Sequence, residues 1–502
     1  MKVFRLTKTR SCTVAVLFAA ILIYSGGELW QTLTWPPFFS FDETLEVDYV
    51  YQLTQGHLPT FFGGAQFNPL KLAYPYNVQW RYQHPPLFYL LETPFFKLGD
   101  TLNHPIRGIW LMRAFVYLLG ITLILVSFWV ARWAFGRSSK AIYIVPLLVA
   151  SNRCLPSVVF NYTLATLWVA LLFGCTCKII RTFPRKLSSS TRFFWVAVVA
   201  LAPLTRLSTI PIMMLCCGAV AILMIIRHSQ ATLRDWLHLV ILPVVIAVLS
   251  SSWFYIRLHR LSGNFTGSQP AWSASHLGRT TDISLLKAIT TASFYKNSLA
   301  QYHNMSSINS TRYGWLAVFS LTLIPLLLGV MAYVRRIFSN VRQRDQRNGS
   351  LTENALIILL CTFAFFGTTV QQLLFYKQGG SDNSVYFSLI SIVFALTIAA
   401  GFCQFKKLYR LLVPAWLIIH LAFFMLEVRI KWPFSTNQPL HGSGFVTHAL
   451  VFIGLALVGV GTIMAILLVA KNANAADTLT ENNDNPKISK EQNEALHTNS
   501  MP

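Results

Sequence analysis

Long apolar runs separated by short polar segments fill most of the chain between residues 12 and 470. A helix needs about 20 apolar residues to cross a hydrocarbon core of ~30 Å. The pattern therefore predicts an all-α, polytopic membrane fold with about twelve spanning helices. The predicted spans are 12–30, 109–131, 141–153, 158–178, 193–207, 209–226, 237–256, 314–334, 354–375, 385–404, 411–427 and 446–470. Two of them, 141–153 and 193–207, are short and are typical of broken or tilted helices.

Basic residues between the runs indicate how the helices are oriented. If the N-terminus lies inside, every strongly basic connection also falls inside, as the positive-inside rule requires. The basic residues of the N-terminal segment and of these connections are Lys2, Arg5, Lys8, Arg10, Arg132, Arg137, Lys140, Lys178, Arg181, Arg185, Lys186, Arg192, Arg227, Arg234, Arg335, Arg336, Arg342, Arg344, Arg347, Lys406, Lys407 and Arg410.

The same alternation divides the chain into one module and a tail. Residues 1–470 form a transmembrane module with two long outer loops, 31–107 and 257–312. The segment 471–502 is polar and rich in Asn, Glu and Lys, which predicts a disordered cytoplasmic tail. We therefore expect a multi-pass protein of the cell (plasma) membrane with both termini in the cytoplasm.

The composition supports a membrane protein and argues against two other classes. The chain of 502 residues is 54% hydrophobic and 12% charged, which is about half the charged share of a soluble domain. The net charge of +23 arises mostly in the connections, where it sets topology and meets anionic lipid, so we expect no nucleic-acid partner. The eight cysteines lie in or beside apolar runs and show no zinc-binding spacing with histidine.

Four carboxylates stand within seven positions at the start of the first outer loop, in a chain that is otherwise short of acid. They are Asp42, Glu43, Glu46 and Asp48. Clustered carboxylates suit acid–base chemistry or a divalent metal. Of the four, Glu46 and Asp48 are expected to be solvated polar faces, and the first two are the candidates for chemistry.

The residues around the carboxylates have the spacing of a short helix. Leu45, Tyr49 and Leu53 recur at i, i+4 and i+8 and define one apolar face. Ser40 and Glu43 have the form of a capping box, so the helix is expected to begin near Ser40. Capping is thus an alternative to chemistry for Glu43, and Asp42 would also be favourable at a helix N-terminus.

A second polar segment, 81–89, follows in the same loop and reads Arg-Tyr-Gln-His-Pro-Pro-Leu-Phe-Tyr. Prolines suit the first turn of a helix. The apolar stretch 86–98 would span only about 20 Å as a helix, which is too short to cross the membrane. We expect an interfacial or re-entrant helix there, with His84 at its N-terminus and in the same loop as Asp42.

These features in this order resemble the type C superfamily of polytopic membrane glycosyltransferases. The specific part is Asp42-Glu43 at the start of a large outer loop, followed by His84-Pro85-Pro86-Leu87-Phe88-Tyr89 and by Arg113 entering the second span. The likeness is greatest to the branch of protein O-mannosyltransferases and lipid A aminoarabinose transferases. Weaker agreements are Leu204-Thr205-Arg206-Leu207-Ser208, Trp253-Phe254-Tyr255-Ile256-Arg257, Gly263-Asn264-Phe265-Thr266-Gly267 and Asn161-Tyr162-Thr163.

The chain departs from this resemblance at one place. Many relatives carry an Arg-Tyr pair entering a late span, whereas segment 378–386 here reads Gln-Gly-Gly-Ser-Asp-Asn-Ser-Val-Tyr. The missing arginine puts late phosphate contacts in doubt. Lys377 is the candidate that would replace it.

The resemblance implies an inverting transfer of a sugar from a polyprenyl-phosphate donor to an extracytoplasmic acceptor. The sugar would be of the mannose or arabinose type, the acceptor a glycan, lipid or protein, and no cofactor is implied, although a divalent metal fits the carboxylates. Asp42 would be the general base and Glu43 an acceptor contact or a cap. The leaving phosphate needs cationic or donor groups, for which the candidates are Arg81, His84, Arg206, Arg257 and Lys377. Taken singly, each cation is also typical of interfacial snorkelling.

Other functions compatible with the pattern are a transporter or lipid flippase of the cell envelope, and an inactive scaffold. Coupled carriers usually place carboxylates near the middle of the membrane, whereas Glu28 and Glu427 lie near span ends here. In the second outer loop, Trp272, Tyr295 and Tyr302 suit either sugar stacking or anchoring at the interface.

Overall fold

The computed structural model describes residues 2–38, 42–73, 77–136, 138–154, 158–185, 187–280, 283–342, 348–405, 408–436 and 444–483. Throughout these residues the regular structure is helical, without a strand. Nine helical segments within them are long and apolar enough to cross a membrane, and three shorter apolar helices accompany them. The predicted all-α, multi-pass membrane fold is confirmed, whereas the count of about twelve spanning helices stays a prediction, because three of the predicted spans are the shorter helices.

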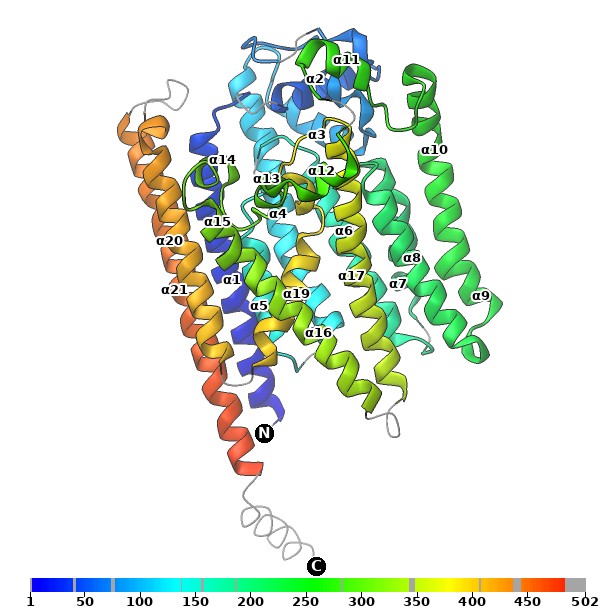
Figure 1. Cartoon of the computed structure of the whole chain (residues 1–502), viewed down its shortest axis with the longest axis vertical. Coiled ribbons are helices and arrows are strands. Elements are labelled where there is room, and N and C mark those ends of the chain that lie inside the picture. Colours follow the sequence, from blue (N-terminus) through cyan, green and yellow to red (C-terminus); the bar gives the residue numbers. More distant parts are fainter. Residues whose placement is uncertain are drawn as a thin grey trace, which may run out of the picture.

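The long segments run side by side and form the lower part of the molecule in Figure 1. They are α1 (Lys2–Thr34), α4 (Pro105–Phe135), α6 (Tyr162–Thr182), α8 (Thr209–Ile226), α9 (Leu233–Trp236) with η5 (Leu237–Ile241) and α10 (Leu242–Ser262), α15 (Gly314–Ala317) with η6 (Val318–Leu323) and α16 (Ile324–Arg342), α17 (Asn348–Lys377), α20 (Tyr409–Thr436) and α21 (Gly444–Asn483). The shorter apolar helices are α5 (Ala141–Ala150), α7 (Ser189–Leu201) with η3 (Ala202–Leu204), and α19 (Ser391–Gln404).

Smaller elements cap the bundle. The first outer loop forms α2 (Glu43–Thr54), η1 (Phe61–Gly63), η2 (Trp80–Gln83) and α3 (Leu87–Leu98). The second forms α11 (Pro270–Leu277), α12 (Leu285–Thr290), α13 (Ala292–Ser298) and α14 (Met305–Ile308). The turn η4 (His228–Gln230) follows α8, and α18 (Val385–Ser388) precedes α19.

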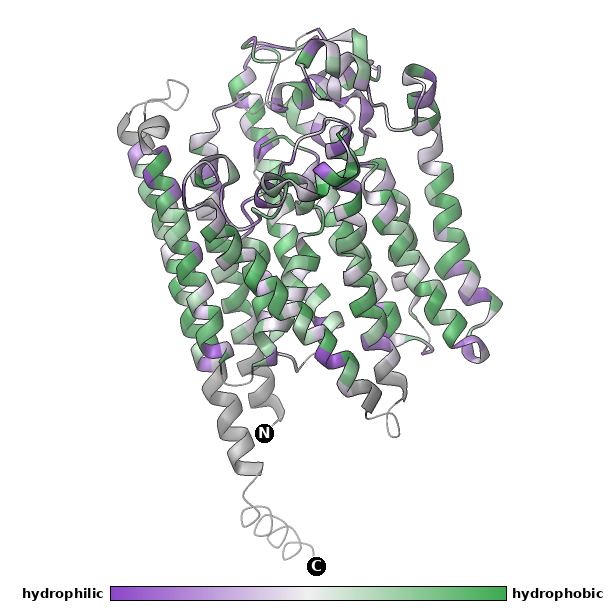
Figure 2. Ribbon diagram, viewed as in Figure 1, coloured by the Kyte–Doolittle hydropathy of each residue, from purple (hydrophilic) through white to green (hydrophobic). Residues whose placement is uncertain are grey.

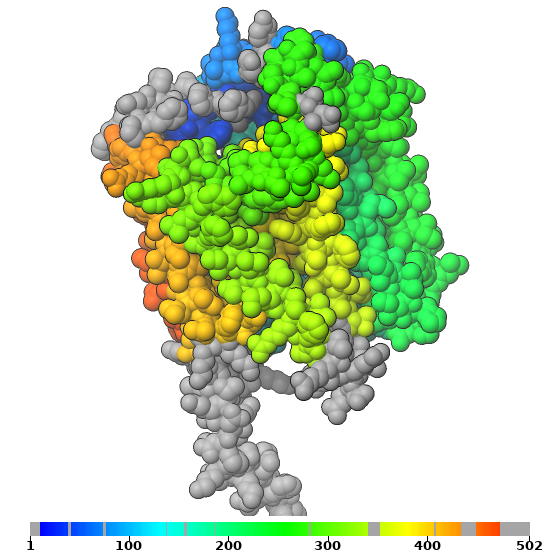
Figure 3. Space-filling view, in the orientation of Figure 1, coloured from blue at the N-terminus to red at the C-terminus, as the bar shows by residue number. Residues whose placement is uncertain are grey.

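The two ends of the bundle differ. Helices α2, α3 and α11 lie at one end, which we call the site end, and the N-terminal end of α1 and the C-terminal end of α21 lie at the other, the terminus end (Figure 1). Hydrophobic residues dominate the long helices between the ends, and polar residues gather above and below them (Figure 2). In the space-filling view the second outer loop, in green, covers the upper part of the visible face (Figure 3).

Two contacts between spans depend on glycine. An ideal Cβ on Gly26 of α1 would lie 2.4 Å from the carbonyl oxygen of Gly454 in α21. A Cβ on Gly329 of α16 would lie 2.1 Å from the carbonyl oxygen of Thr397 in α19. Small residues let helix backbones approach closely where lipid supplies no hydrophobic driving force between them. The first contact therefore lets α1 pack closely against α21, and the second lets α16 pack closely against α19.

The first outer loop contains the expected short helices, but its polar faces are not as predicted. Helix α2 carries Leu45 and Tyr49 on its buried side, and α3 spans about 18 Å, which fits the prediction that it does not cross the membrane. The expectation that Glu46 and Asp48 are solvated is wrong, because both are fully buried. Ser40, the expected start of α2, lies outside the described residues.

Two further expectations concern later segments. Tyr302 is buried with its ring edge-on to Trp416 at 5.1 Å, so it does not present a free face for a sugar. Trp272 is half-buried, with its ring 5.4 Å from that of Trp80. At the other end of the chain, α21 continues to Asn483, and because residues 484–502 lie outside the described part, the disordered tail stays a prediction.

The orientation of the bundle in the membrane is a prediction that surface labelling can test. Phe62 in η1 is 73% exposed at the site end, and Leu233 in α9 is 83% exposed near the terminus end. We expect a membrane-impermeant thiol reagent to label Phe62→Cys in intact cells and Leu233→Cys only after the membrane is opened. The unsubstituted chain is the control, because its eight free cysteines are buried or half-buried. The reverse labelling pattern would place Asp42 in the cytoplasm.

Candidate functional site

Asp42 is the carboxylate of the acidic stretch that reaches the surface. It precedes α2, its side chain is 40% exposed, and it makes no capping hydrogen bond to the helix. Its carboxylate is instead paired with the guanidinium of Arg81 in η2. Helix capping therefore does not account for this side chain.

Glu43 is occupied by a structural ion pair. Its carboxylate receives hydrogen bonds from Arg113 Nε at 2.7 Å and Nη2 at 2.5 Å, and both side chains are buried. The backbone N–H groups of Phe38 and Val159 donate to the same carboxylate at 3.0 and 2.9 Å. Arg113 also donates to the carbonyl oxygens of Trp35 and Pro36. These contacts favour a structural role for Glu43 over the expected acceptor contact.

Asp48 organises the loop that follows α2. Its Oδ1 accepts from the backbone N–H groups of Gln66 and Phe67, both at 2.7 Å. Its Oδ2 accepts from the side-chain amides of Gln52, at 2.8 Å, and Gln79. Burial raises the pKa of Asp48, and these hydrogen bonds oppose the rise. Gln79 in turn caps η2 through Arg81 N, so Asp48 helps to place Arg81.

Arg81 lies between two acids, Asp42 before α2 and Glu46 within it. Besides Asp42, its Nε lies 3.3 Å from Glu46 Oε1, and Glu46 is fully buried. Burial raises the pKa of Glu46 from 4.5 to about 7, against the Arg81 charge, the Tyr89 hydroxyl and the Arg206 charge, while Asp42 adds to the rise. The pKa of Arg81 is raised, because the Asp42 and Glu46 charges outweigh its burial. Arg81 therefore stays charged while Glu46 titrates near neutrality.

His84 faces two guanidinium groups and is held neutral. Its Nε2 lies 3.2 Å from Arg81 Nη1 and 3.4 Å from Arg206 Nη1. Burial, Arg206 and Arg81 together lower the pKa of His84 well below its usual 6.5. For Nε2 to accept from either arginine, the single proton of the neutral ring must sit on Nδ1. His84 thus serves as an acceptor between two cations in this state.

Arg206 is positioned by the start of α6. It donates to Asn161 Oδ1 and, at 2.8 Å, to the hydroxyl of Tyr162, and its guanidinium lies 3.6 Å from the centre of the Tyr162 ring. Asn161 Nδ2 donates to the Tyr89 hydroxyl at 3.1 Å. Burial raises the pKa of Tyr89 well above its usual value, so its hydroxyl keeps its proton. Tyr89 also stacks on Tyr49 at 3.7 Å.

These contacts form a ring of side chains at the site end. In order, it runs through Arg81, His84, Arg206, Asn161, Tyr89 and Glu46, and returns to Arg81. Its members come from α2, η2 and α3, and from the segments before α3, before α6 and after η3. Asp42 contacts this ring through Arg81 and is the exposed acid beside it.

The remaining two predicted cations have other neighbours. Arg257 Nη2 donates to the carbonyl oxygens of Leu58 and Pro59 at 3.3 and 2.8 Å, which ties α10 to the first outer loop. Its predicted phosphate contact stays a prediction. Lys377 ends α17, and its carbonyl oxygen accepts from Ile283 N of the second loop. Its predicted substrate contact stays a prediction.

Several residues of the site were not predicted as such. Glu46 and Tyr89 are members of the ring. Glu92 of α3 is fully buried, and its carboxyl has no hydrogen-bond partner among the described residues. Burial and the nearby Glu43 and Glu46 raise the pKa of Glu92 well above its usual value, which favours its neutral form. The signals were present: Glu46 follows Glu43 by three residues, and Glu92 is the lone acid in an apolar stretch.

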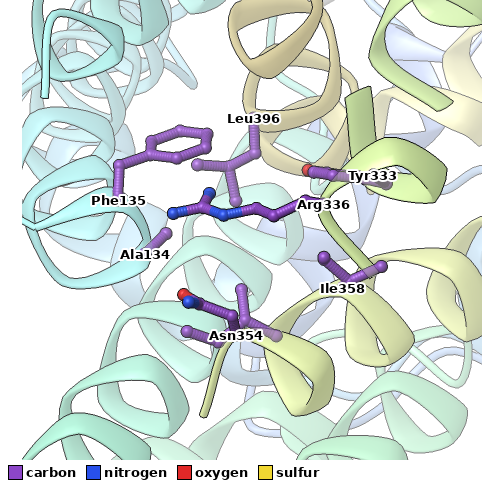
Figure 4. Close-up of a pocket in the computed structure, with 8 residues that line it drawn as sticks. Ala134, Phe135, Tyr333, Arg336, Asn354, Ile358 and Leu396 are labelled. Carbon is purple, nitrogen blue, oxygen red and sulfur yellow. The ribbon is translucent and has the colours of Figure 1, made fainter. Parts of the chain in front are cut away.

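A recess at the terminus end is separate from these residues. It is lined by Ala134, Phe135, Tyr333, Arg336, Asn354, Ile357, Ile358 and Leu396, and Figure 4 shows that these side chains come from α4, α16, α17 and α19. It lies at the opposite end of the spans from α2 and α3 (Figure 1).

The site end thus combines an exposed carboxylate with two buried arginines and a neutral histidine. A carboxylate can accept a proton from a hydroxyl group, and clustered guanidinium groups can bind and stabilise a phosphate. Across the described residues, no three or more His, Cys, Asp or Glu side chains gather in a way that would hold a metal ion.

Comparisons with known proteins give similarity in fold. No family model and no curated protein matches the chain. The fold is similar to that of ArnT from Cupriavidus metallidurans, crystallised with undecaprenyl phosphate, with a TM-score of 0.47 and 14% identity over 92% of this chain and 76% of that chain. It is also similar to the oligosaccharyltransferase of Archaeoglobus fulgidus in its apo form, with a TM-score of 0.42 and 13% identity over 91% of this chain and 55% of that chain.

The pair of Glu43 and Arg113 yields a prediction on stability. Glu43→Gln removes the negative charge and leaves Arg113 charged and buried, which costs about 3–5 kcal/mol of unfolding free energy. Asp100→Asn is the matched control, because Asp100 and His104 form an exposed pair for which we expect a change of about 0–1 kcal/mol. Denaturant unfolding in detergent measures both. Equal stability of Glu43→Gln and the unsubstituted chain would show that the pair does not hold the loop.

Proposed function

We propose that the protein is a membrane glycosyltransferase that transfers a sugar from a polyprenyl-phosphate donor to a hydroxyl acceptor outside the cytoplasm. The observation that carries this proposal is the pairing of one exposed carboxylate, Asp42, with the cluster of Arg81, His84 and Arg206. The resemblance of the sequence motifs supports the same reading, because Asp42, His84 and Arg206 are positions that carry it.

The reaction that suits this geometry is a single displacement. The acceptor oxygen bonds to the anomeric carbon as the bond from that carbon to the phosphate oxygen breaks, which inverts the configuration. The acceptor proton passes to the Asp42 carboxylate. The polyprenyl phosphate leaves with the bonding electrons, and its added charge is stabilised by Arg81 and Arg206.

The electrostatics of the cluster favour a phosphate ligand. Arg81 and Arg206 are both buried, and the neutral His84 between them supplies no negative charge. Arg206 donates to two neutral groups, Asn161 and Tyr162, and forms no ion pair with an acid in the part of the chain that the structure describes. A phosphate would supply the missing negative charge through charge-assisted hydrogen bonds.

The base can be tested by one substitution. Asp42→Asn keeps the size of the side chain but cannot accept the proton, so transfer from labelled polyprenyl-phosphate sugars of the mannose and arabinose types should fall about 10²–10⁴-fold in membranes. Asp100→Asn is the control, because Asp100 lies in the same loop, 47% exposed and paired with His104. Equal transfer by Asp42→Asn and the unsubstituted chain would end the assignment of Asp42.

The transporter or flippase is distinguished in the same preparation. If the unsubstituted chain transfers no sugar from any of these donors but moves a lipid or solute across liposome membranes, the transporter or flippase hypothesis replaces that of a glycosyltransferase. Finding which lipid-linked sugar co-purifies with the chain would identify the donor.

A further inference from the structure

The two acids that share Arg81 are not equivalent. Asp42 is exposed to an incoming acceptor, whereas Glu46 lies one helical turn further into α2 and is fully buried. Arg81 itself is only 10% exposed, so it depends on these two carboxylates for its counter-charge. Within the described residues, neither oxygen of Glu46 makes a well-oriented hydrogen bond, so the contact with Arg81 is an ion pair at 3.3 Å.

We propose that Glu46 is a positioning residue that keeps Arg81 neutralised and in place while Asp42 accepts the acceptor proton. The inference rests on the proposed function, since it assigns Glu46 a part in the same transfer. When Asp42 takes a proton, Arg81 loses the negative charge of its exposed partner. A buried charge left without a partner is strongly unfavourable, and an ionised Glu46 supplies the replacement without moving.

The charged and titratable groups that face Glu46 determine whether its carboxyl is ionised. They are Asp42 before α2, Tyr49 of α2, Arg81 of η2, Tyr89 and Glu92 of α3, and Arg206 after η3. Arg81 and Arg206 favour its ionised form, and Asp42 disfavours it. Burial raises the pKa of Glu92 well above its usual value and so favours its uncharged form.

The protonation of Glu46 would also change how Arg81 is shared. With Glu46 neutral, Arg81 has Asp42 as its single ionised partner and holds it more tightly, which leaves Asp42 less available to the acceptor. With Glu46 ionised, the Arg81 guanidinium is shared between two carboxylates. Asp42 is then held less tightly by Arg81 and is more available to the acceptor. The active form is therefore the one with Glu46 ionised.

The test is the pH dependence of transfer. Since the pKa of Glu46 is raised to about 7, the ionised fraction grows as pH rises, and transfer should increase about tenfold between pH 6 and pH 8. Glu46→Gln, which cannot ionise, should be at least about tenfold slower at pH 8 and show no rise over this range. Glu46→Asp should restore the rise. Asp100→Asn is the control, because this exposed acid of the same loop is paired with His104 and should keep the original profile.

An unchanged pH profile in Glu46→Gln would overturn the inference, provided that thermal unfolding shows that the variant is folded. If Glu46→Gln does not fold, or if the unsubstituted chain transfers no sugar from any donor, infrared difference spectra decide. They should show a carboxyl that titrates near pH 7, persists in Glu92→Gln, and titrates at lower pH in Asp42→Asn, because the Asp42 charge raises the pKa of Glu46. No such shift would overturn the coupling, whereas absence of transfer alone would overturn the proposed function.

Discussion

The buried pair of Glu43 and Arg113 is the contact on which the site end depends. One carboxylate joins α2, the segment before it, the start of α4 and the backbone ahead of α6, through hydrogen bonds from Arg113, Phe38 and Val159. Removing either charge would strand the other in a buried position. Because Glu43 is held so firmly, the residue before it, Asp42, is presented to the surface in a defined place.

The guanidinium of Arg81 is shared among several groups at the site end. It pairs with the exposed Asp42, lies beside the buried Glu46 and contacts His84, which in turn contacts Arg206. A phosphate arriving here would compete for a guanidinium that is already divided among several groups. That competition would free the base at the moment when the leaving group is bound, and so links donor binding to proton transfer in the proposed reaction.

The sequence predicted the helical membrane fold, because runs of apolar residues of spanning length have few other solutions. It also singled out Asp42, Arg81, His84 and Arg206, which the structure brings together at one end. It did not predict the burial of Glu46 and Asp48, since local periodicity cannot show that α3 and the 64–67 loop cover α2. Nor did it show that Glu43 is taken by Arg113, 70 residues away, because such pairing depends on tertiary packing.

The most direct test of the proposed site is a structure of the chain with a polyprenyl phosphate bound, determined by electron cryo-microscopy in a lipid nanodisc. We expect the phosphate to lie within hydrogen-bonding distance of the guanidinium groups of Arg81 and Arg206. The prenyl chain should lead into the bundle, and Asp42 should face the open side. A phosphate bound at the terminus end near Arg336, or at no defined place on the chain, would contradict it.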